Sequence, residues 1–182
     1  MQPIKQLTSS VALLATPEHY LFTPWDLRAL LPDLSMAAFK TLLSRAVVHG
    51  HLARVCRGLY MDERVASSHG ELLFHAAARL RADTFNYISL ETVLSDAGVI
   101  SQVPINWITI MSAGRSNIIR CGEWGTIEFV HTRTRPETIT GQLHYDSRCH
   151  LWRASVSLAL RDMRATRRNQ DLIDWGAVDE SL

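Results

Sequence analysis

The 182-residue sequence has no apolar run near the length of about 18 residues that a membrane-spanning helix needs. Residues 1–5 lack both the long apolar stretch and the small-residue cleavage site of a secretory signal. Cysteine is scarce, and its three residues, Cys56, Cys121 and Cys149, are widely spaced and odd in number. This pattern argues against a disulfide framework and for a reducing compartment. These absences predict a cytoplasmic protein without a membrane segment.

The sequence also lacks the common motifs of enzyme active sites. It contains no Gly-x-x-x-x-Gly-Lys phosphate loop, no Gly-x-Gly-x-x-Gly fingerprint and no His-Glu-x-x-His motif. No Ser, His and Asp combination has a nucleophile-elbow context. The best zinc-ligand set shows no paired spacing such as Cys-x-x-Cys; it consists of Cys121, His144, Cys149 and His150. We therefore predict no enzymatic activity, no metal and no cofactor.

The residues that are present describe an ordinary globular chain. Hydrophobic residues make up 47% and charged residues 20% of the sequence, which is enough apolar mass for a core. The formal net charge is only +1, so the field of the whole molecule does not mark a nucleic-acid binder. The length fits one domain or two small ones. Any charged function must therefore come from local clusters.

The N-terminal third carries strong helix start and stop signals. A weak helical pattern covers residues 5–15. Thr23, which is followed by proline, predicts the start of a second helix that stops near Pro32. Ser35 is a good N-cap for a third helix that closes at Gly50. We therefore expect three helices in this part of the chain.

The third predicted helix has two different faces. The apolar face should pack in the core; it comprises Phe39, Leu42, Leu43, Ala46 and Val47. The opposite face carries Lys40, Thr41, Ser44, Arg45 and Val48. After the third helix the helical period is lost, and residues 52–61 indicate two short strands that turn at Arg57 and Gly58. Gly58 is the expected residue with a positive φ angle.

The order helix, helix, hairpin is typical of a winged helix-turn-helix, which places one helix in the DNA major groove. Four cations and no Asp or Glu lie between Ser35 and Met61. The predicted DNA-contacting residues are Ser35, Lys40, Thr41, Ser44 and Arg45 on the helix, and Arg54 and Arg57 on the hairpin. The alternative is a solvated helix face beside an exposed hairpin. Because charge sign, caps, glycines and element order agree, we predict binding of double-stranded DNA.

The second part of the chain shows a mixed α and β pattern. We expect a domain joint within residues 62–68, with a winged helix-turn-helix domain over residues 1–66 and a mixed domain over 67–182. Helices are predicted over 67–82 and 89–96, strands over 85–88, 107–111 and 126–130, and a long helix over 150–168. The predicted fold class is α+β: an N-terminal winged helix-turn-helix followed by a small mixed α/β domain that ends in a long helix.

The last predicted helix would carry a basic stripe at helical spacing. Its residues are Arg153, Ser157, Arg161, Arg164 and Arg168. A row of cations with little internal compensation suggests an acidic partner, either a phosphate backbone or another protein, and the alternative is plain solvation. Arg115, in a Gly-Arg-Ser turn, is a further partner or anion contact, or else pairs with Glu123 or Glu128.

Six short segments of the sequence have the pattern of a known family. They are residues 54–60 (RVCRGLY), 87–95 (YISLETVLS) with 98–100 (GVI), 108–110 (ITI) with 114–116 (GRS), and 125–129 (GTIEF), together with the chain around them from about residue 20 to 132. The sequence resembles the AbiEi family of abortive-infection antitoxins, the antitoxin half of type IV toxin–antitoxin systems. The region after His131 matches this family only loosely.

This resemblance implies a protein in two parts. The N-terminal winged helix would repress its own operon by binding operator repeats, and the C-terminal part would oppose a co-encoded nucleotidyltransferase-type toxin. The resulting hypothesis is a DNA-binding antitoxin and transcriptional autorepressor. Two alternatives stay open: a winged-helix module that docks a protein partner, and a transcription regulator whose C-terminal half senses a small ligand.

Overall fold

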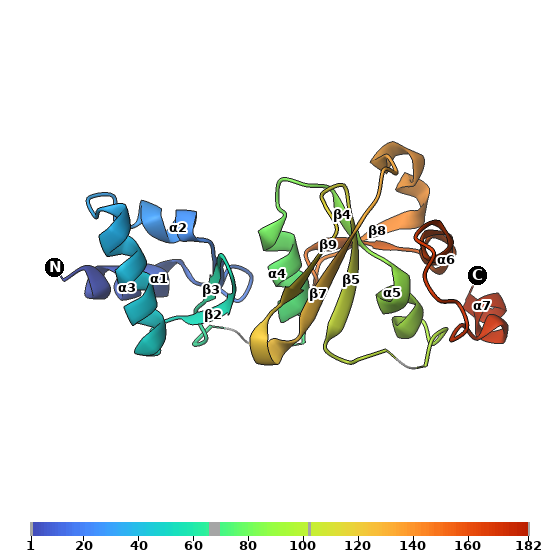
Figure 1. The fold of residues 1–182 in the computed structure, drawn as a ribbon, viewed down its shortest axis with the longest axis horizontal. Helices are drawn as coiled ribbons and strands as arrows, with labels where there is room; N and C mark the ends of the chain where they lie inside the picture. The colour runs from blue at the N-terminus through green and yellow to red at the C-terminus, as the bar shows by residue number, and fades with distance from the viewer. Residues whose placement is uncertain (1, 66–69, 102, 182) are drawn as a thin grey trace. The chain divides into compact units, whose positions relative to one another are not determined.

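The computed structural model describes residues 2–65, 70–101 and 103–181 (Figure 1). The chain divides into two compact units, Met1–Gly70 and Glu71–Leu182. Seven α-helices and two β-sheets lie in the described part of the chain, so the fold class is mixed α+β. The predicted boundary between residues 66 and 67 falls outside the described residues.

The first unit runs in the order helix, strand, two helices and hairpin. Its helices are α1 (Pro3–Leu14), α2 (Pro24–Ala29) and α3 (Met36–Val48), and its strands are β1 (Leu21–Phe22), β2 (Ala53–Cys56) and β3 (Leu59–Met61). The strands form an antiparallel sheet in the order β1-β3-β2. Gly58 turns the hairpin with a φ of +82°, which confirms the predicted turn.

Local signals fix the starts of α2 and α3 as predicted. In the capping box of α2, the Thr23 N–H donates to Asp26 Oδ2 at 2.6 Å and the Asp26 N–H donates to Thr23 Oγ1 at 3.3 Å. The Ser35 hydroxyl caps α3 by accepting the Ala38 N–H at 3.2 Å. These bonds satisfy backbone donors that the first turn of each helix would otherwise leave unpaired.

The apolar face of α3 packs into the core of the first unit. Phe39, Leu43 and Ala46 are buried, and Leu42 and Val47 are partly buried against the same cluster. The other buried members are Leu7, Val11, Phe22, Leu27, Leu31 and Leu52. Because burying one Leu or Phe side chain contributes about 1.5–3 kcal/mol, this face fixes α3 and leaves its opposite side in solvent.

Arg28 on α2 holds the turn between α2 and α3. Its guanidinium donates hydrogen bonds to the backbone carbonyls of Leu31, Pro32 and Leu34. The bond to the Pro32 oxygen is 3.1 Å long and that to the Leu34 oxygen 2.5 Å. The guanidinium carbon also lies 5.7 Å from the centroid of the Phe39 ring. One side chain therefore links α2, the turn and the buried face of α3.

The Arg28→Met variant should destabilise the first unit. The substitution keeps an apolar stem but removes three hydrogen bonds from a charged donor, and water can replace part of them. We expect a loss of about 1–3 kcal/mol in the free energy of unfolding, measured by urea denaturation and by hydrogen exchange of the α3 amides. Arg45→Met, which changes an exposed arginine on α3, is the matched control. An equal loss in both variants would show that Arg28 has no special role.

The second unit is built on a six-stranded mixed sheet in the order β6-β7-β5-β4-β9-β8. The strands are β4 (Asn86–Ile88), β5 (Trp107–Ser112), β6 (Asn117–Arg120), β7 (Thr126–His131), β8 (Leu143–Asp146) and β9 (Leu151–Ala154). The pairs β4–β9 and β5–β7 are parallel and the other pairs are antiparallel. This arrangement confirms the strands predicted over 85–88, 107–111 and 126–130, but β6, β8 and β9 were not predicted.

Helices cover both faces of this sheet. They are α4 (Leu72–Leu80), α5 (Leu90–Asp96) and α6 (Val156–Ala165), and a further helix, α7 (Trp175–Ser181), follows at the end of the described chain. Figure 1 shows α4 on one side of the sheet and α5 and α6 on the other. Three short 3-10 turns lie at residues 122–124, 136–138 and 140–142. The helix predicted over 67–82 corresponds to α4, and residues 67–69 lie outside the described residues.

The prediction of one long helix over residues 150–168 is wrong. Residues 151–154 form β9, which pairs with β4 and β8 in the interior of the sheet. Ser155 then caps α6 by accepting the Leu158 N–H at 3.1 Å, and the backbone turns at Arg167 with a φ of +55°. The described chain ends in the short helix α7 rather than a long one. Pairing with β4, which is remote in the sequence, and with its neighbour β8 has overridden the local helical spacing.

Ser89 directly precedes α5, the helix predicted over residues 89–96, but its hydroxyl does not cap that helix. Instead it donates to Asp162 Oδ2 on α6 at 2.7 Å, and both residues are buried. Burial raises the pKa of Asp162. The Thr109 hydroxyl donates to the Ser89 carbonyl at 2.7 Å, and the next residue, Leu90, has a φ of +59°. A buried polar network therefore joins β5, α5 and α6.

Candidate nucleic-acid interface

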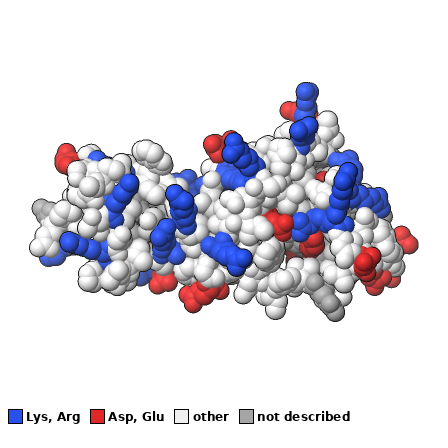
Figure 2. All heavy atoms as spheres, viewed as in Figure 1, with Lys and Arg blue, Asp and Glu red and all other residues white. Residues whose placement is uncertain are grey.

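The solvent side of α3 and the hairpin carries all of the predicted DNA-contacting residues. Each of them is exposed: Ser35, Lys40, Thr41, Ser44, Arg45, Arg54 and Arg57. We call this set the basic face of the first unit. In Figure 2, blue Lys and Arg side chains lie over the region that α3 and the hairpin occupy in Figure 1. Helical periodicity alone was enough to predict which side of α3 is exposed.

The cations of the basic face are not neutralised within the described residues. Lys40, Arg45, Arg54 and Arg57 form none of the ion pairs found in the described part of the chain. No Asp or Glu occurs between Ser35 and Met61 to provide a partner locally. Four full positive charges therefore face solvent, where a polyanion can reach them.

The hydroxyl groups of the basic face differ in the hydrogen bonds that they already form. The Ser35 hydroxyl accepts the Ala38 N–H in the α3 cap, and the Thr41 hydroxyl donates to the Ala37 carbonyl at 3.1 Å. The Ser44 hydroxyl bonds to none of the described residues. Ser44 and the four cations therefore have the most hydrogen-bonding capacity to offer a ligand.

A cavity of about 440 Å³ lies beside α3, against the start of α1. Ile4 and Leu34 form part of its apolar lining, while Thr41 and Arg45 line it from α3. Lys40 does not contribute to this lining. The basic face is therefore divided: Thr41 and Arg45 lie on the edge of α3 toward α1, and Lys40 lies farther from it.

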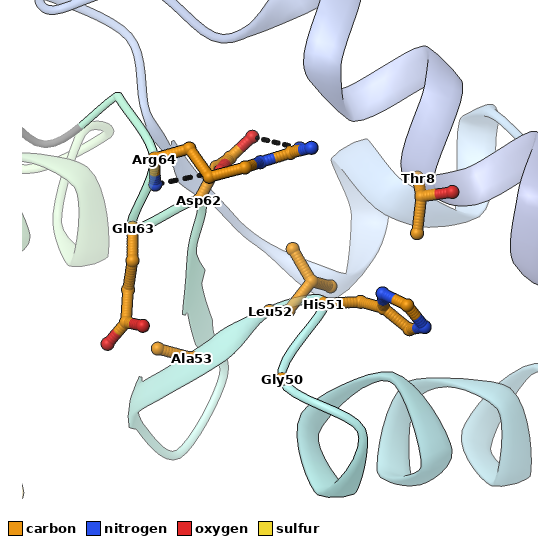
Figure 3. Close-up of a pocket in the computed structure, with 8 residues that line it drawn as sticks. All are labelled: Thr8, Gly50, His51, Leu52, Ala53, Asp62, Glu63 and Arg64. Atoms are coloured by element: carbon orange, nitrogen blue, oxygen red, sulfur yellow. Dashed lines mark hydrogen bonds and ion pairs between the residues drawn. The ribbon is translucent and has the colours of Figure 1, made fainter.

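A smaller polar cavity of about 160 Å³ lies at the base of the hairpin (Figure 3). Figure 3 shows Thr8 on α1, His51 beneath it, and Arg64 lying across Asp62. The buried Asp62 carboxylate accepts Arg64 Nε at 2.9 Å and Nη2 at 2.7 Å. The hydrogen bonds from the Arg64 side chain hold the pKa of Asp62 below its ordinary value. Arg64 is thus neutralised, and its ion pair with Asp62 holds the chain that follows β3.

The predicted basic stripe does not form in the second unit. Arg153 lies in β9 and binds Asp96 Oδ2 at 2.7 Å and Asp146 Oδ2 at 3.2 Å. Arg168 lies beyond the end of α6 and binds Glu91 at 2.5 Å and Glu128 at 2.8 Å. Both arginines are therefore neutralised internally, and the interpretation of an uncompensated stripe is wrong for them.

The remaining predicted contact residues of this unit stay exposed. Ser157, Arg161 and Arg164 lie on α6, and the Arg164 guanidinium carbon is 5.8 Å from the centroid of the Trp175 ring. Arg115 is exposed and pairs with neither predicted carboxylate among the described residues, because Glu128 binds Arg168 instead. Arg161 and Arg164 share α6, whereas Arg115 lies in the turn between β5 and β6.

The best zinc-ligand set of the sequence, which was not predicted to bind a metal, does not come together as a site. The described part of the chain has no group of three or more His, Cys, Asp or Glu side chains that could hold a metal ion. Burial raises the pKa of the Cys149 thiol to about 11. This thiol therefore stays protonated at neutral pH and is a poor nucleophile or metal ligand.

Two clusters escaped prediction from the sequence. The first is the clamp that Arg28 forms on the turn before α3. The second joins Glu91, Trp107, Glu128 and Arg168, where the Trp107 Nε1–H donates to Glu128 Oε2 at 3.0 Å. Only the first has a local signal, an arginine three to six residues before the carbonyls that it binds.

Comparisons with protein families, with curated protein sequences and with solved structures found no match to this chain. Among the described helices, none combines the length and the apolar character that crossing a membrane requires. The function of each unit must therefore be argued from its own geometry and chemistry.

Proposed function

We propose that the first unit is a winged helix-turn-helix that binds double-stranded DNA. In this proposal α3 enters the major groove and the β2–β3 hairpin is the wing beside it. The element order α1-β1-α2-α3-β2-β3 and the strand order β1-β3-β2 support the proposal. The Arg28 clamp supports it further, because a recognition helix must be held rigidly against the helix before it.

The observation that carries the proposal is the uncompensated charge of the basic face. Lys40, Arg45 and the two hairpin arginines are exposed and unpaired among the described residues. Duplex DNA presents one phosphate charge per about 1.7 Å of its axis, so bringing such cations to it releases condensed counterions. Because these cations are already solvent-facing and break no internal ion pair on binding, that gain is not offset by lost salt bridges.

The shape of α3 suits a groove. Its 13 residues make it about 20 Å long, and the major groove, about 12 Å wide, admits one α-helix. Ala37 and Ser44 are small side chains on its exposed face, which allows the backbone to approach base edges closely. Val48, 79% exposed, is an apolar group suited to a thymine methyl group. We assign phosphate contacts to the arginines and base contacts to Ser44 and Lys40.

For the whole protein, we propose a DNA-binding antitoxin and transcriptional autorepressor of a type IV toxin–antitoxin operon. It would counteract a nucleotidyltransferase-type toxin and have no catalytic activity of its own. Support comes from the resemblance of the segments around residues 54–60, 87–95 and 125–129 to the AbiEi family. The first unit would bind the operator and the second would provide antitoxicity.

Footprinting of the full chain on DNA upstream of its own gene is the direct test. We expect protection at moderate salt, with log K falling linearly as log salt rises, because the four cations replace counterions. Co-expression with a neighbouring nucleotidyltransferase-like gene should relieve the growth arrest caused by that gene. The absence of protection would contradict the repressor proposal. Salt-independent binding to a protein partner would favour a protein-docking module instead.

A further inference from the structure

A pocket of about 330 Å³ in the second unit brings together groups from four separate segments. Its charged lining consists of Glu91 on α5, Glu128 on β7 and Arg168 after α6. Trp107, at the start of β5, and the side chains of Ile100 and Leu172 form much of the apolar lining. This pocket lies wholly within the second unit and uses none of the residues of the basic face.

Glu128 and Arg168 form an ion pair with two hydrogen bonds. Arg168 Nη1 donates to Glu128 Oε1 at 2.8 Å and Nη2 donates to Oε2 at 3.0 Å, a bidentate pair. Trp107 Nε1–H adds a third bond to Oε2 at 3.0 Å. Burial alone would raise the pKa of Glu128, but these bonds from Arg168 and Trp107 hold it below its ordinary value. Both members of the pair are therefore ionised at neutral pH and cancel each other's charge.

Glu91 is the carboxylate that is only partly satisfied, because it shares Arg168 with Glu128. Among the described residues, the single donor to its Oε1 is the Arg168 Nε–H, at 2.5 Å. Its Oε2 is covered and has no hydrogen-bond donor among the described residues. A covered carboxylate oxygen without a donor costs free energy that a bound donor would recover. With one guanidinium against two carboxylates, the pocket keeps an excess negative charge.

We propose that this pocket binds a small organic cation: an ammonium, amidinium or guanidinium group carried on an apolar or aromatic body. The cationic nitrogen donates to the Glu91 carboxylate. Because Oε2 is covered in the unbound protein, the carboxylate turns about its last side-chain bond, and this turn replaces the bond from Arg168 Nε–H to Oε1 by the bond from the ligand. The apolar body packs against Trp107, Ile100 and Leu172, and the indole face adds a cation–π attraction. The volume lies in the range of small-molecule sites, roughly 300–1,000 Å³. An anion is disfavoured, because two carboxylates already surround Arg168.

Isothermal titration calorimetry of the full chain with three compounds of one shape tests the charge requirement. Benzamidine is a planar cation, benzamide its neutral counterpart and benzoate the anion. We expect benzamidine to bind at least tenfold more tightly than benzamide, benzoate to give no binding, and added salt to weaken benzamidine binding. Equal affinity for benzamidine and benzamide, or no heat with any of the three at millimolar concentration, would overturn the proposal without any variant.

The Glu91→Gln variant tests the assigned residue. It removes the charge but keeps an acceptor for Arg168 Nε–H, so the fold should persist, which thermal unfolding checks. We expect at least a tenfold loss of benzamidine affinity. Glu123→Gln, which neutralises an exposed carboxylate outside the pocket lining, is the matched control and should bind as the unmodified chain does. Unchanged affinity in folded Glu91→Gln would remove Glu91 from the site. No DNA enters these measurements, so their outcome is independent of the proposed repressor function.

Discussion

The Lys40→Ala/Arg45→Ala double variant should bind the DNA upstream of its own gene about 2–4 kcal/mol more weakly than the unmodified chain, a loss of roughly 30- to 1,000-fold. Both side chains are exposed on α3, on either side of Ser44. A single base or phosphate contact is worth about 1–3 kcal/mol, and the losses at two neighbouring contacts do not add in full. Fluorescence anisotropy at several salt concentrations measures the affinity and its salt slope. A smaller slope should accompany the weaker binding, because fewer counterions are released.

A matched variant separates this local effect from the change in net charge. Arg120→Ala/Arg133→Ala removes two exposed cations from the second unit and changes the net charge equally. It should leave DNA affinity close to that of the unmodified chain. If both double variants lose affinity equally, the basic face has no special role. If the α3 variant binds normally while Arg54→Ala/Arg57→Ala does not, α3 is the wrong element to place in the groove.

The Arg168→Ala variant should destabilise the second unit by about 2–4 kcal/mol. Removing this side chain breaks its bonds to Glu91 and Glu128 and leaves two carboxylates in one pocket without a cation. Breaking fully buried pairs in this way costs about 3–5 kcal/mol, and partial solvent access at this site lowers the figure. Urea denaturation followed by tryptophan fluorescence gives the free energy of unfolding. Arg161→Ala, an exposed position on α6, is the control and should change stability little.

At acid pH, the difference in the free energy of unfolding between Arg168→Ala and the unmodified chain should become small. Burial would raise the pKa of Glu128, yet the bonds from Arg168 and Trp107 hold it below its ordinary value. A lowered carboxyl pKa contributes stability that is complete above the unfolded-state value of about 4.3 and is lost as the pH falls through the folded-state value. The gap between Arg168→Ala and the unmodified chain should therefore be largest at neutral pH and shrink below about pH 4. A gap that stays constant from neutral pH to acid would contradict the ionic origin.

The three helices and the hairpin of the first unit could be predicted because their signals are local, whereas the two-residue strand β1 was not predicted. The Thr23 capping box spans four residues, the Ser35 cap precedes its helix directly, and Gly58 marks the hairpin by itself. The periodicity of α3 also determined which side faces solvent. In such segments the sequence within one or two turns contains most of the interactions that decide the structure.

In the second unit, the predictions were wrong where a residue is held by a partner that is remote in the sequence. Arg153 fits a helical stripe by spacing, but it lies in a strand and binds Asp96, 57 residues away. Arg168 binds Glu91 across 77 residues and Glu128 across 40. Strand pairing and ion pairs over such separations leave no trace in a local window. The pocket around Glu91 was missed for the same reason, since its lining comes from four segments.

At position 90, beside Glu91, burial and backbone conformation favour different side chains. Leu90 is fully buried, yet its backbone has a φ of +59°, a conformation that costs an L-residue roughly 1–2 kcal/mol. Glycine would relieve the backbone but leave a void where the isobutyl group packs, a change that typically costs more than the strain. A β-branched side chain would fill the space and worsen the backbone. Few side chains therefore fit this position, and the backbone of Leu90 sets the direction from which the Glu91 side chain leaves α5.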